Sequence, residues 1–206
     1  LPLALGAEQK WDKTNHLQIR KKSDAQFIAD VKKAVGLAAN PVLKDGTIAS
    51  ATGELKLNAK KRRFQAVSPK SEAVILDKND YAKGKFMRVK NGKTNAVFYI
   101  GSLDNKPLTE SKRMMLIHLT DIKNEGIVFS DSTMTVIKDW GSSKLLLRKN
   151  IAEIGLAASG DYQLFACAAN GKHLAEIPLK RNGNEQVFKA DNSVSGGVML
   201  YELVRK

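Results

Sequence analysis

The sequence predicts a mainly β fold, an antiparallel β-sandwich with a short N-terminal helical arm. Two observations carry this expectation. From residue 44 onward, short runs of alternating apolar and polar residues recur at about 10-residue intervals, the strand spacing of sandwiches and barrels. Asn-Gly pairs, which favour tight hairpin turns because both residues tolerate positive φ, follow strand-like runs at Asn91-Gly92, Asn170-Gly171 and Asn182-Gly183.

One stretch with helical spacing precedes these runs. Ser23 and Asp24 suit an N-cap, and apolar residues then recur at three- and four-residue intervals up to Leu37. The pattern ends at Asn40-Pro41, because the residue before a proline avoids the α region. We therefore expect a linker and helix over residues 1–45 and a β-sandwich domain over residues 46–206.

The expected strands follow one another without an internal repeat. The apolar or alternating runs that define them fall at residues 54–57, 62–67, 73–76, 86–90, 96–100, 113–119, 133–138, 144–148, 151–157, 162–168, 173–177, 186–188 and 198–204. Turn-forming Gly, Asn, Asp and Ser separate most of them. Short strands joined in this way favour antiparallel pairing.

Composition excludes several classes of protein. The 206 residues are 43% hydrophobic and 27% charged, which excludes a disordered or collagen-like chain. Cys167 is the single cysteine and there are three histidines, so we expect no disulfide, no metal site and no cofactor. No run approaches the roughly 18 apolar residues of a membrane-spanning helix. Residues 1–7 are either the end of a signal peptide, which predicts a secreted or periplasmic protein, or a buried strand of an upstream domain.

The chain is strongly basic, with 34 Lys and Arg against 21 Asp and Glu. Its densest run, formed by Lys60, Lys61, Arg62 and Arg63, falls between two expected strands. This run is either the solvated tip of a hairpin or a polyanion contact. Nucleic-acid or polyanion binding through it is the alternative function, although an aromatic content of only 6% argues against a platform for stacking bases.

No catalytic motif is present in the sequence. Gly155 and Gly160 lack the Lys-Ser/Thr of a phosphate-binding loop, and no Gly-x-Ser-x-Gly elbow occurs. Acidic residues that are candidates for a glycosidase pair stand beside turn residues, where carboxylates commonly accept hydrogen bonds from nearby backbone: Asp104, Glu110, Asp121, Asp131 and Asp139.

Four further residues are candidates for chemistry. Cys167 and His173 fall on adjacent expected strands and form either a catalytic dyad or, as the apolar neighbours of Cys167 favour, part of a core with a buried structural thiol. His118 lies in an apolar run and is expected to be a hydrogen-bonded core or interface histidine. Trp140 either stacks on a sugar ring or plugs the edge of the sandwich.

Several segments resemble one known family. Residues 102–121 read SLDNKPLTESKRMMLIHLTD, which is similar to a stretch in the C-terminal β-domains of large bacterial glycoside-hydrolase-like proteins. Residues 52–55 (TGEL) and 64–69 (FQAVSP) resemble the opening and second strand of those domains, and shorter matches continue to residues 201–203. Asn105 stands where the family has glycine, and asparagine also adopts positive φ.

In that family the β-domain follows a (β/α)8 barrel, whose strand ends supply the catalytic carboxylates. The resemblance therefore implies an accessory, non-catalytic domain of a carbohydrate-active protein, which packs on an upstream catalytic module or binds polysaccharide. The helix at residues 24–39 would then be the last barrel helix or its connector, and the basic charge suits an acidic polysaccharide. The candidate ligand-binding residues are Trp140, Asp139, Arg148 and Asp104.

Overall fold

The computed structural model describes residues 45–50 and 52–206. The chain divides into two compact units, residues 1–66 and 67–206. In the first unit, antiparallel strands follow one another in sequence order: β1 (Ile48–Ala49), β2 (Leu55–Asn58) and β3 (Arg63–Val67), whose last residue belongs to the second unit. The helix expected before residue 45 lies outside the described residues. Within them, no helix is long and apolar enough to cross a membrane.

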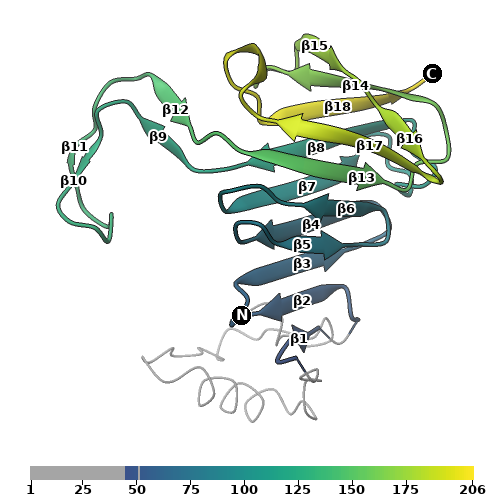
Figure 1. Ribbon diagram of the computed structural model, residues 1–206, viewed down its shortest axis with the longest axis horizontal. Helices are drawn as coiled ribbons and strands as arrows, with labels where there is room; N and C mark the ends of the chain where they lie inside the picture. The colour runs from purple at the N-terminus through teal and green to yellow at the C-terminus, as the bar shows by residue number, and fades with distance from the viewer. Residues whose placement is uncertain (1–44, 51) are drawn as a thin grey trace, which may run out of the picture. The chain divides into compact units, whose positions relative to one another are not determined.

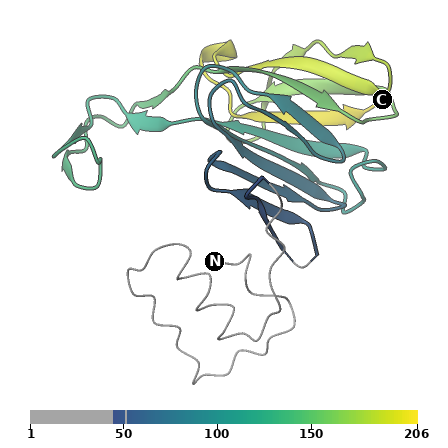
Figure 2. The same ribbon diagram turned by 60° about the horizontal axis from the view of Figure 1, so that its bottom comes forward.

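Two antiparallel sheets face each other in the second unit (Figure 1), and Figure 2 shows the same layers from a second direction. One sheet has the strand order β4 (Ser71–Leu76), β7 (Ala96–Ser102), β8 (Arg113–Leu119), β18 (Leu200–Arg205), β14 (Tyr162–Cys167) and β15 (His173–Ile177). The other has the order β16 (Lys180–Asn182), β17 (Glu185–Asp191), β13 (Ile151–Leu156), β6 (Met87–Lys90) and β5 (Tyr81–Lys83). The predicted antiparallel β-sandwich is confirmed.

Alternation along the strands explains why the sheets stack. In β7, Phe98 and Ile100 are fully buried while the intervening Tyr99 is only partly buried. The inward side chains of both sheets form one apolar core, which includes Phe98, Leu116 and Leu164 from the first sheet and Val89, Ile154 and Phe188 from the second. Each such side chain contributes about 1.5–3 kcal/mol on burial, so the two sheets stabilise each other.

A buried carboxylate adds a polar connection between the sheets. Glu72 of β4 is only 3% exposed and accepts hydrogen bonds from three consecutive backbone N–H groups at Lys85, Phe86 and Met87, at 2.7–2.8 Å. A side chain at Gly84 would collide with this carboxylate, because its Cβ would lie 2.1 Å from Glu72 Oε2. Glycine at this position therefore leaves room for the carboxylate.

The Asn-Gly pairs have two different roles. Asn170-Gly171 lies in the β14–β15 hairpin and Asn182-Gly183 in the β16–β17 hairpin, with positive φ at both glycines, as predicted. The prediction is wrong at Asn91-Gly92, because β6 and β7 belong to different sheets and do not pair. Gly92 is required there by close packing instead, since an added Cβ would lie 2.2 Å from the carbonyl oxygen of Ile151.

Between β8 and β13 the chain leaves the sandwich as a projecting ribbon (Figure 1), which we call the arm and define as residues 121–149. Its proximal part pairs β9 (Ile122–Asn124) with β12 (Leu145–Leu147), and its distal part pairs β10 (Val128–Phe129) with β11 (Ile137–Asp139). The sequence predicted strands near β11 and β12 but missed their partners, which are only two and three residues long.

A network of buried polar side chains holds the base of the arm. Asn150 Nδ2 donates to Asn91 Oδ1 (2.9 Å) and to His118 Nε2 (3.0 Å), while the Asn150 backbone N–H donates to Asn192 Oδ1 (2.8 Å). Asn192 Nδ2 in turn donates to the carbonyl oxygen of Arg148 (3.0 Å). The network therefore joins β8, the ends of β6 and β17, and the chain returning from the arm.

His118 is the titratable member of this network and is neutral. It is fully buried and stacks on Phe98, with ring centroids 4.6 Å apart. Burial lowers the pKa of His118 from 6.5 to about 4, and the charge of Asp191 opposes this shift only in part. The prediction of a hydrogen-bonded core histidine is confirmed.

We expect the free energy of unfolding to fall as the pH is lowered from about 6.5 to about 4, because the unfolded chain binds a proton on His118 that the folded chain does not. The difference between the two pKa values corresponds to a loss of about 3 kcal/mol. Urea unfolding across this pH range measures it. The His118→Gln variant keeps all the carboxylates and should show a shallower pH dependence; equal dependence in both proteins would contradict a depressed His118 pKa.

Candidate functional site

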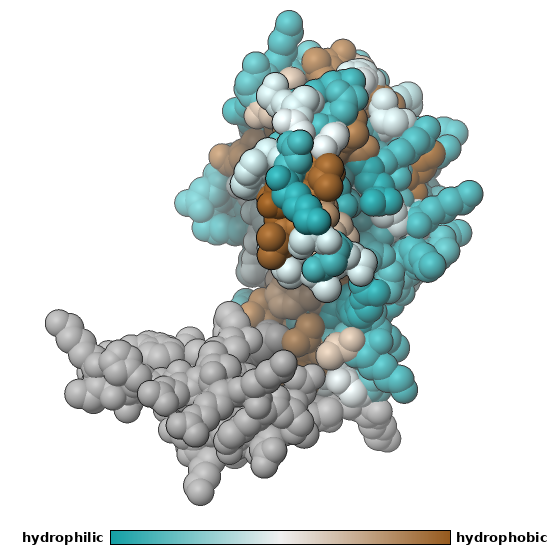
Figure 3. All heavy atoms as spheres, turned by 90° about the vertical axis from the view of Figure 1, so that its left-hand side faces the viewer, coloured by the Kyte–Doolittle hydropathy of each residue, from teal (hydrophilic) through white to brown (hydrophobic). Residues whose placement is uncertain are grey.

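The arm exposes large apolar side chains to solvent. Trp140 is 69% exposed and Leu145 is 63% exposed. Figure 3 faces the arm and shows brown apolar side chains among teal and white ones. Six of the ten exposed large hydrophobic residues of the described chain belong to the arm: Val128, Met134, Val136, Trp140, Leu145 and Leu146. The exposed apolar surface is thus concentrated on one element.

A tight turn holds Trp140 outward. Gly141 has a φ of +68°, and an added Cβ would lie 2.2 Å from the carbonyl oxygen of Glu125, so only glycine fits. The Asp139 carboxylate accepts a hydrogen bond from the Gly141 N–H (2.9 Å), and Asn124 Nδ2 donates to the carbonyl oxygen of Trp140 (3.1 Å). Trp140 therefore does not plug the sandwich edge, which was one of its two expected roles.

The four predicted ligand-binding residues do not meet in one place. Asp139 and Trp140 are neighbours on the arm, and Arg148 lies at its base, where Nη2 is 3.1 Å from Asp121 Oδ2. Asp104 lies in the loop before β8, whereas the arm follows the end of β8. A strand of this length spans roughly 20 Å, which separates Asp104 from the other three.

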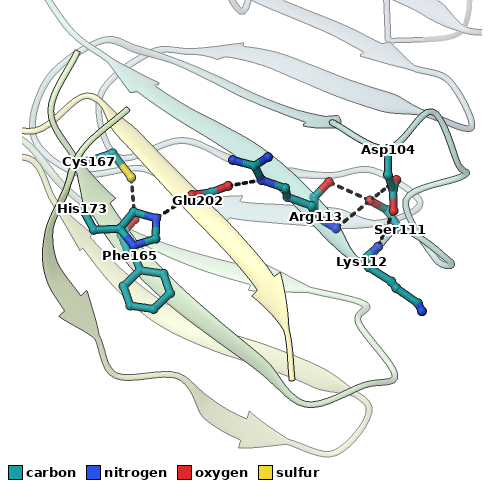
Figure 4. Close-up of polar contacts among 8 residues, drawn as sticks. All are labelled: Asp104, Ser111, Lys112, Arg113, Phe165, Cys167, His173 and Glu202. Carbon is teal, nitrogen blue, oxygen red and sulfur yellow. Dashed lines mark hydrogen bonds and ion pairs between the residues drawn. The ribbon is translucent and has the colours of Figure 1, made fainter. Parts of the chain in front are cut away.

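Asp104 organises the loop between β7 and β8 (Figure 4). Its carboxylate accepts hydrogen bonds from the backbone N–H of Lys112 and the hydroxyls of Ser111 and Ser102, each at 2.8 Å. These bonds, led by that from Lys112, hold the pKa of Asp104 well below its usual range. This is the turn chemistry expected for the acidic residues of this sequence.

The basic run at residues 60–63 lies at the turn between β2 and β3. Lys60, Lys61 and Arg62 are exposed, and Lys61 Nζ lies 3.6 Å from Asp45 Oδ2. The backbone N–H of Lys61 donates to Asn58 Oδ1 (2.9 Å), which closes the turn. The geometry is that of a hairpin tip.

A cavity of about 570 Å³ opens on the second sheet and was not anticipated from the sequence. We call it the lysine pocket, because Lys90, Lys180 and Lys189 line it together with apolar residues such as Ile151 and Val187. Each lysine comes from a different strand, so no run of basic residues signals the site. Glu153 also lines the pocket, but its carboxylate pairs with Arg88 Nη1 at 2.9 Å.

Three metal-ligating side chains converge on the first sheet (Figure 4). Cys167 of β14, His173 of β15 and Glu202 of β18 place one donor atom each within 4.8 Å of the others. His173 Nε2 lies 2.5 Å from Glu202 Oε2, and Arg113 donates to Glu202 Oε1. The ring of Phe165 stacks on that of His173, with centroids 4.1 Å apart. The pairing of β14 with β15 brings Cys167 opposite His173. The prediction that these two residues lie on adjacent strands is therefore confirmed.

The Cys167 thiol is not activated for nucleophilic attack. Only 3% of the residue is exposed, and burial, together with the nearby charge of Glu202, raises the pKa of the thiol. The pKa of Glu202 is lowered, because its hydrogen bonds to His173 and Arg113 outweigh its burial. A reactive cysteine needs the opposite shift, so this geometry supports the structural thiol over the catalytic dyad.

Comparison with known proteins identifies no relative. No family model matches the chain, and neither a curated protein nor a solved structure is significantly similar to it. The resemblance of residues 102–121 to glycoside-hydrolase-like proteins therefore stays a prediction.

We expect iodoacetamide to alkylate Cys167 at least about tenfold more slowly in the folded protein than in urea at the same neutral pH, because the folded thiol is buried and protonated. Intact-mass kinetics measure this, and with one cysteine in the chain each added mass reports Cys167. Labelling of the folded chain as fast as the unfolded one would indicate an activated thiolate and favour the dyad.

Proposed function

We propose that this chain is an accessory, non-catalytic β-sandwich domain whose arm packs on a neighbouring protein module. The observation that carries the proposal is the concentration of exposed apolar side chains on the arm. A two-stranded ribbon is marginally stable by itself, and clustered apolar side chains on a polar surface mark interaction sites. Packing of the arm against a protein surface would remove these side chains from water and stabilise the ribbon.

The charge of the arm favours a protein partner over a polyanion. The whole chain carries a net charge of +13, yet residues 121–149 are nearly balanced. The five basic residues are Lys123, Lys138, Lys144, Arg148 and Lys149, and the four acidic ones are Asp121, Glu125, Asp131 and Asp139. A nucleic acid would gain little electrostatic attraction from such a surface, whereas apolar contact does not depend on charge.

We further propose that the module is the catalytic barrel of a carbohydrate-active protein. The support is the resemblance of residues 102–121, which cover β8 and its flanking loops up to the first residue of the arm. A non-catalytic role agrees with the protonated Cys167 and with the engagement of Asp104 in its own loop.

Site-specific photo-crosslinking in the source organism tests the docking proposal. A benzophenone amino acid replaces Trp140 on the arm in one variant and Leu174, which is 41% exposed on β15, in the control variant. Hydrophobic packing of the arm predicts a cross-link from position 140 to peptides of a carbohydrate-active catalytic module, in the same chain or another, and weak or no cross-linking from position 174. Mass spectrometry identifies the peptides.

Other outcomes would contradict the proposal. Cross-linking of position 140 to this same β-domain would make the arm a self-association element. Cross-linking to nucleic acid would favour the polyanion alternative. Equal, unspecific labelling from positions 140 and 174 would show that the arm has no partner.

The lysine pocket favours a second role, the binding of an acidic polysaccharide. Lys90, Lys180 and Lys189 line the pocket together with apolar residues, and the carboxylate of Glu153, which also lines it, is paired with Arg88. Carboxylate or sulfate groups on a sugar would form charge-assisted hydrogen bonds with the lysines. The apolar side chains of Ile151 and Val187 would contact the sugar ring.

Affinity electrophoresis in gels that contain polygalacturonate tests this role. The triple variant Lys90→Ala, Lys180→Ala, Lys189→Ala should lose most of its retardation at low salt. The control variant Lys60→Ala, Lys61→Ala, Arg62→Ala removes the same charge from the β2–β3 turn and should migrate like the wild type. If instead the control variant loses its retardation and the triple lysine variant keeps it, polyanion binding at residues 60–63 is favoured. The same conclusion follows if the control variant loses its retardation both on these gels and on gels that contain DNA.

A further inference from the structure

The cluster of Cys167, His173 and Glu202 has the composition of a transition-metal site. Thiolate, imidazole and carboxylate are the three donor types that zinc uses in proteins, and three protein ligands leave a fourth tetrahedral position for water. Among the described residues these three form the one group of this kind. An ion pair explains His173 and Glu202 by themselves, but it does not need a thiol as the third neighbour.

The donor atoms are close to the spacing that one ion requires. Zinc–ligand bonds of about 2.0–2.3 Å place two tetrahedral donors about 3.5 Å apart. The three donors already lie within 4.8 Å of one another, so the sulfur needs to move by about 1 Å at most. The 2.5 Å contact between His173 Nε2 and Glu202 Oε2 must open by about 1 Å, which small side-chain rotations provide.

Neighbouring groups hold two of the three donors in position. Arg113 donates to Glu202 Oε1 and leaves Oε2 directed at His173. Phe165 lies flat against the imidazole, with an angle of 5° between the rings. Such outer contacts orient metal ligands before the ion arrives. The His173 side chain is 42% exposed, so the ion and its water ligand can be reached from solvent.

We propose that Cys167, His173 and Glu202 bind one Zn²⁺ ion, with water as the fourth ligand. On binding, the thiol proton of Cys167 passes to solvent, and His173 binds through Nε2 with its ring proton on Nδ1. No electron transfer is involved. The sequence led us to expect no metal, because a single cysteine excludes a site built from cysteines and three histidines leave little room for a histidine-rich one. The mixed donor set arises from the pairing of three strands.

Titration of the full chain with Co²⁺, followed by displacement with Zn²⁺, tests the site. Cobalt–thiolate bonds absorb in the near ultraviolet, and with one cysteine in the chain that absorption reports Cys167. We expect saturation at one equivalent of Co²⁺ and loss of the absorption when Zn²⁺ is added. His173→Gln and Glu202→Gln should each weaken Co²⁺ binding at least about tenfold, and Cys167→Ser should abolish the absorption.

Glu176→Gln is the matched control, because Glu176 is an exposed carboxylate on β15 outside the cluster, and its titration should equal that of the wild type. Far-ultraviolet circular dichroism establishes that each variant is folded; if Glu202→Gln unfolds, the half-exposed His173→Gln decides the question. The proposal would be overturned if the wild-type protein showed no cobalt–thiolate absorption, or if His173→Gln bound Co²⁺ with the affinity of the wild type.

Discussion

The side chain of Asn150 is the point on which the arrangement of both sheets and the arm depends. It bonds Asn91 and His118, while its backbone bonds Asn192, so one buried amide contacts the ends of strands from both layers. All four residues of this network are buried, and a buried donor or acceptor that loses its hydrogen bond costs about 1–3 kcal/mol. The bond from Asn192 to the carbonyl oxygen of Arg148 extends this network to the chain that returns from the arm, so directional bonds hold the arm at its base.

The sandwich acts as a scaffold that displays three separate surfaces. The inward side chains of the two sheets form an apolar core, in which Glu72 is a buried polar exception. The lysine pocket lies on the second sheet, the cluster of Cys167, His173 and Glu202 on the first, and the arm extends from one end. The three surfaces are built from different residues, so substitutions can change one of them at a time.

Alternation made the fold predictable, whereas pairing made the sites unpredictable. β8 was predicted with correct bounds, because its more buried and more exposed residues alternate. β15 was also predicted with correct bounds, because a turn precedes it. β16 was missed because all three of its residues are exposed and polar. Trp140 was recognised, but its exposure depends on the arm, whose short partner strands carry no pattern. The lysine pocket and the Glu202 ion pairs require strand order, which the sequence does not reveal.

The two ends of the arm meet, since the backbone N–H of Arg148 donates to the carbonyl oxygen of Asp121 (2.9 Å), beside the ion pair between their side chains. The chain between these two residues is therefore an insertion that leaves and re-enters the sandwich at one point. Evolution can lengthen, shorten or exchange that insertion without shifting the register of β8 or β13. The scaffold and its attachment to other proteins can therefore diverge at different rates, with the specificity of assembly changing while the β-domain stays the same.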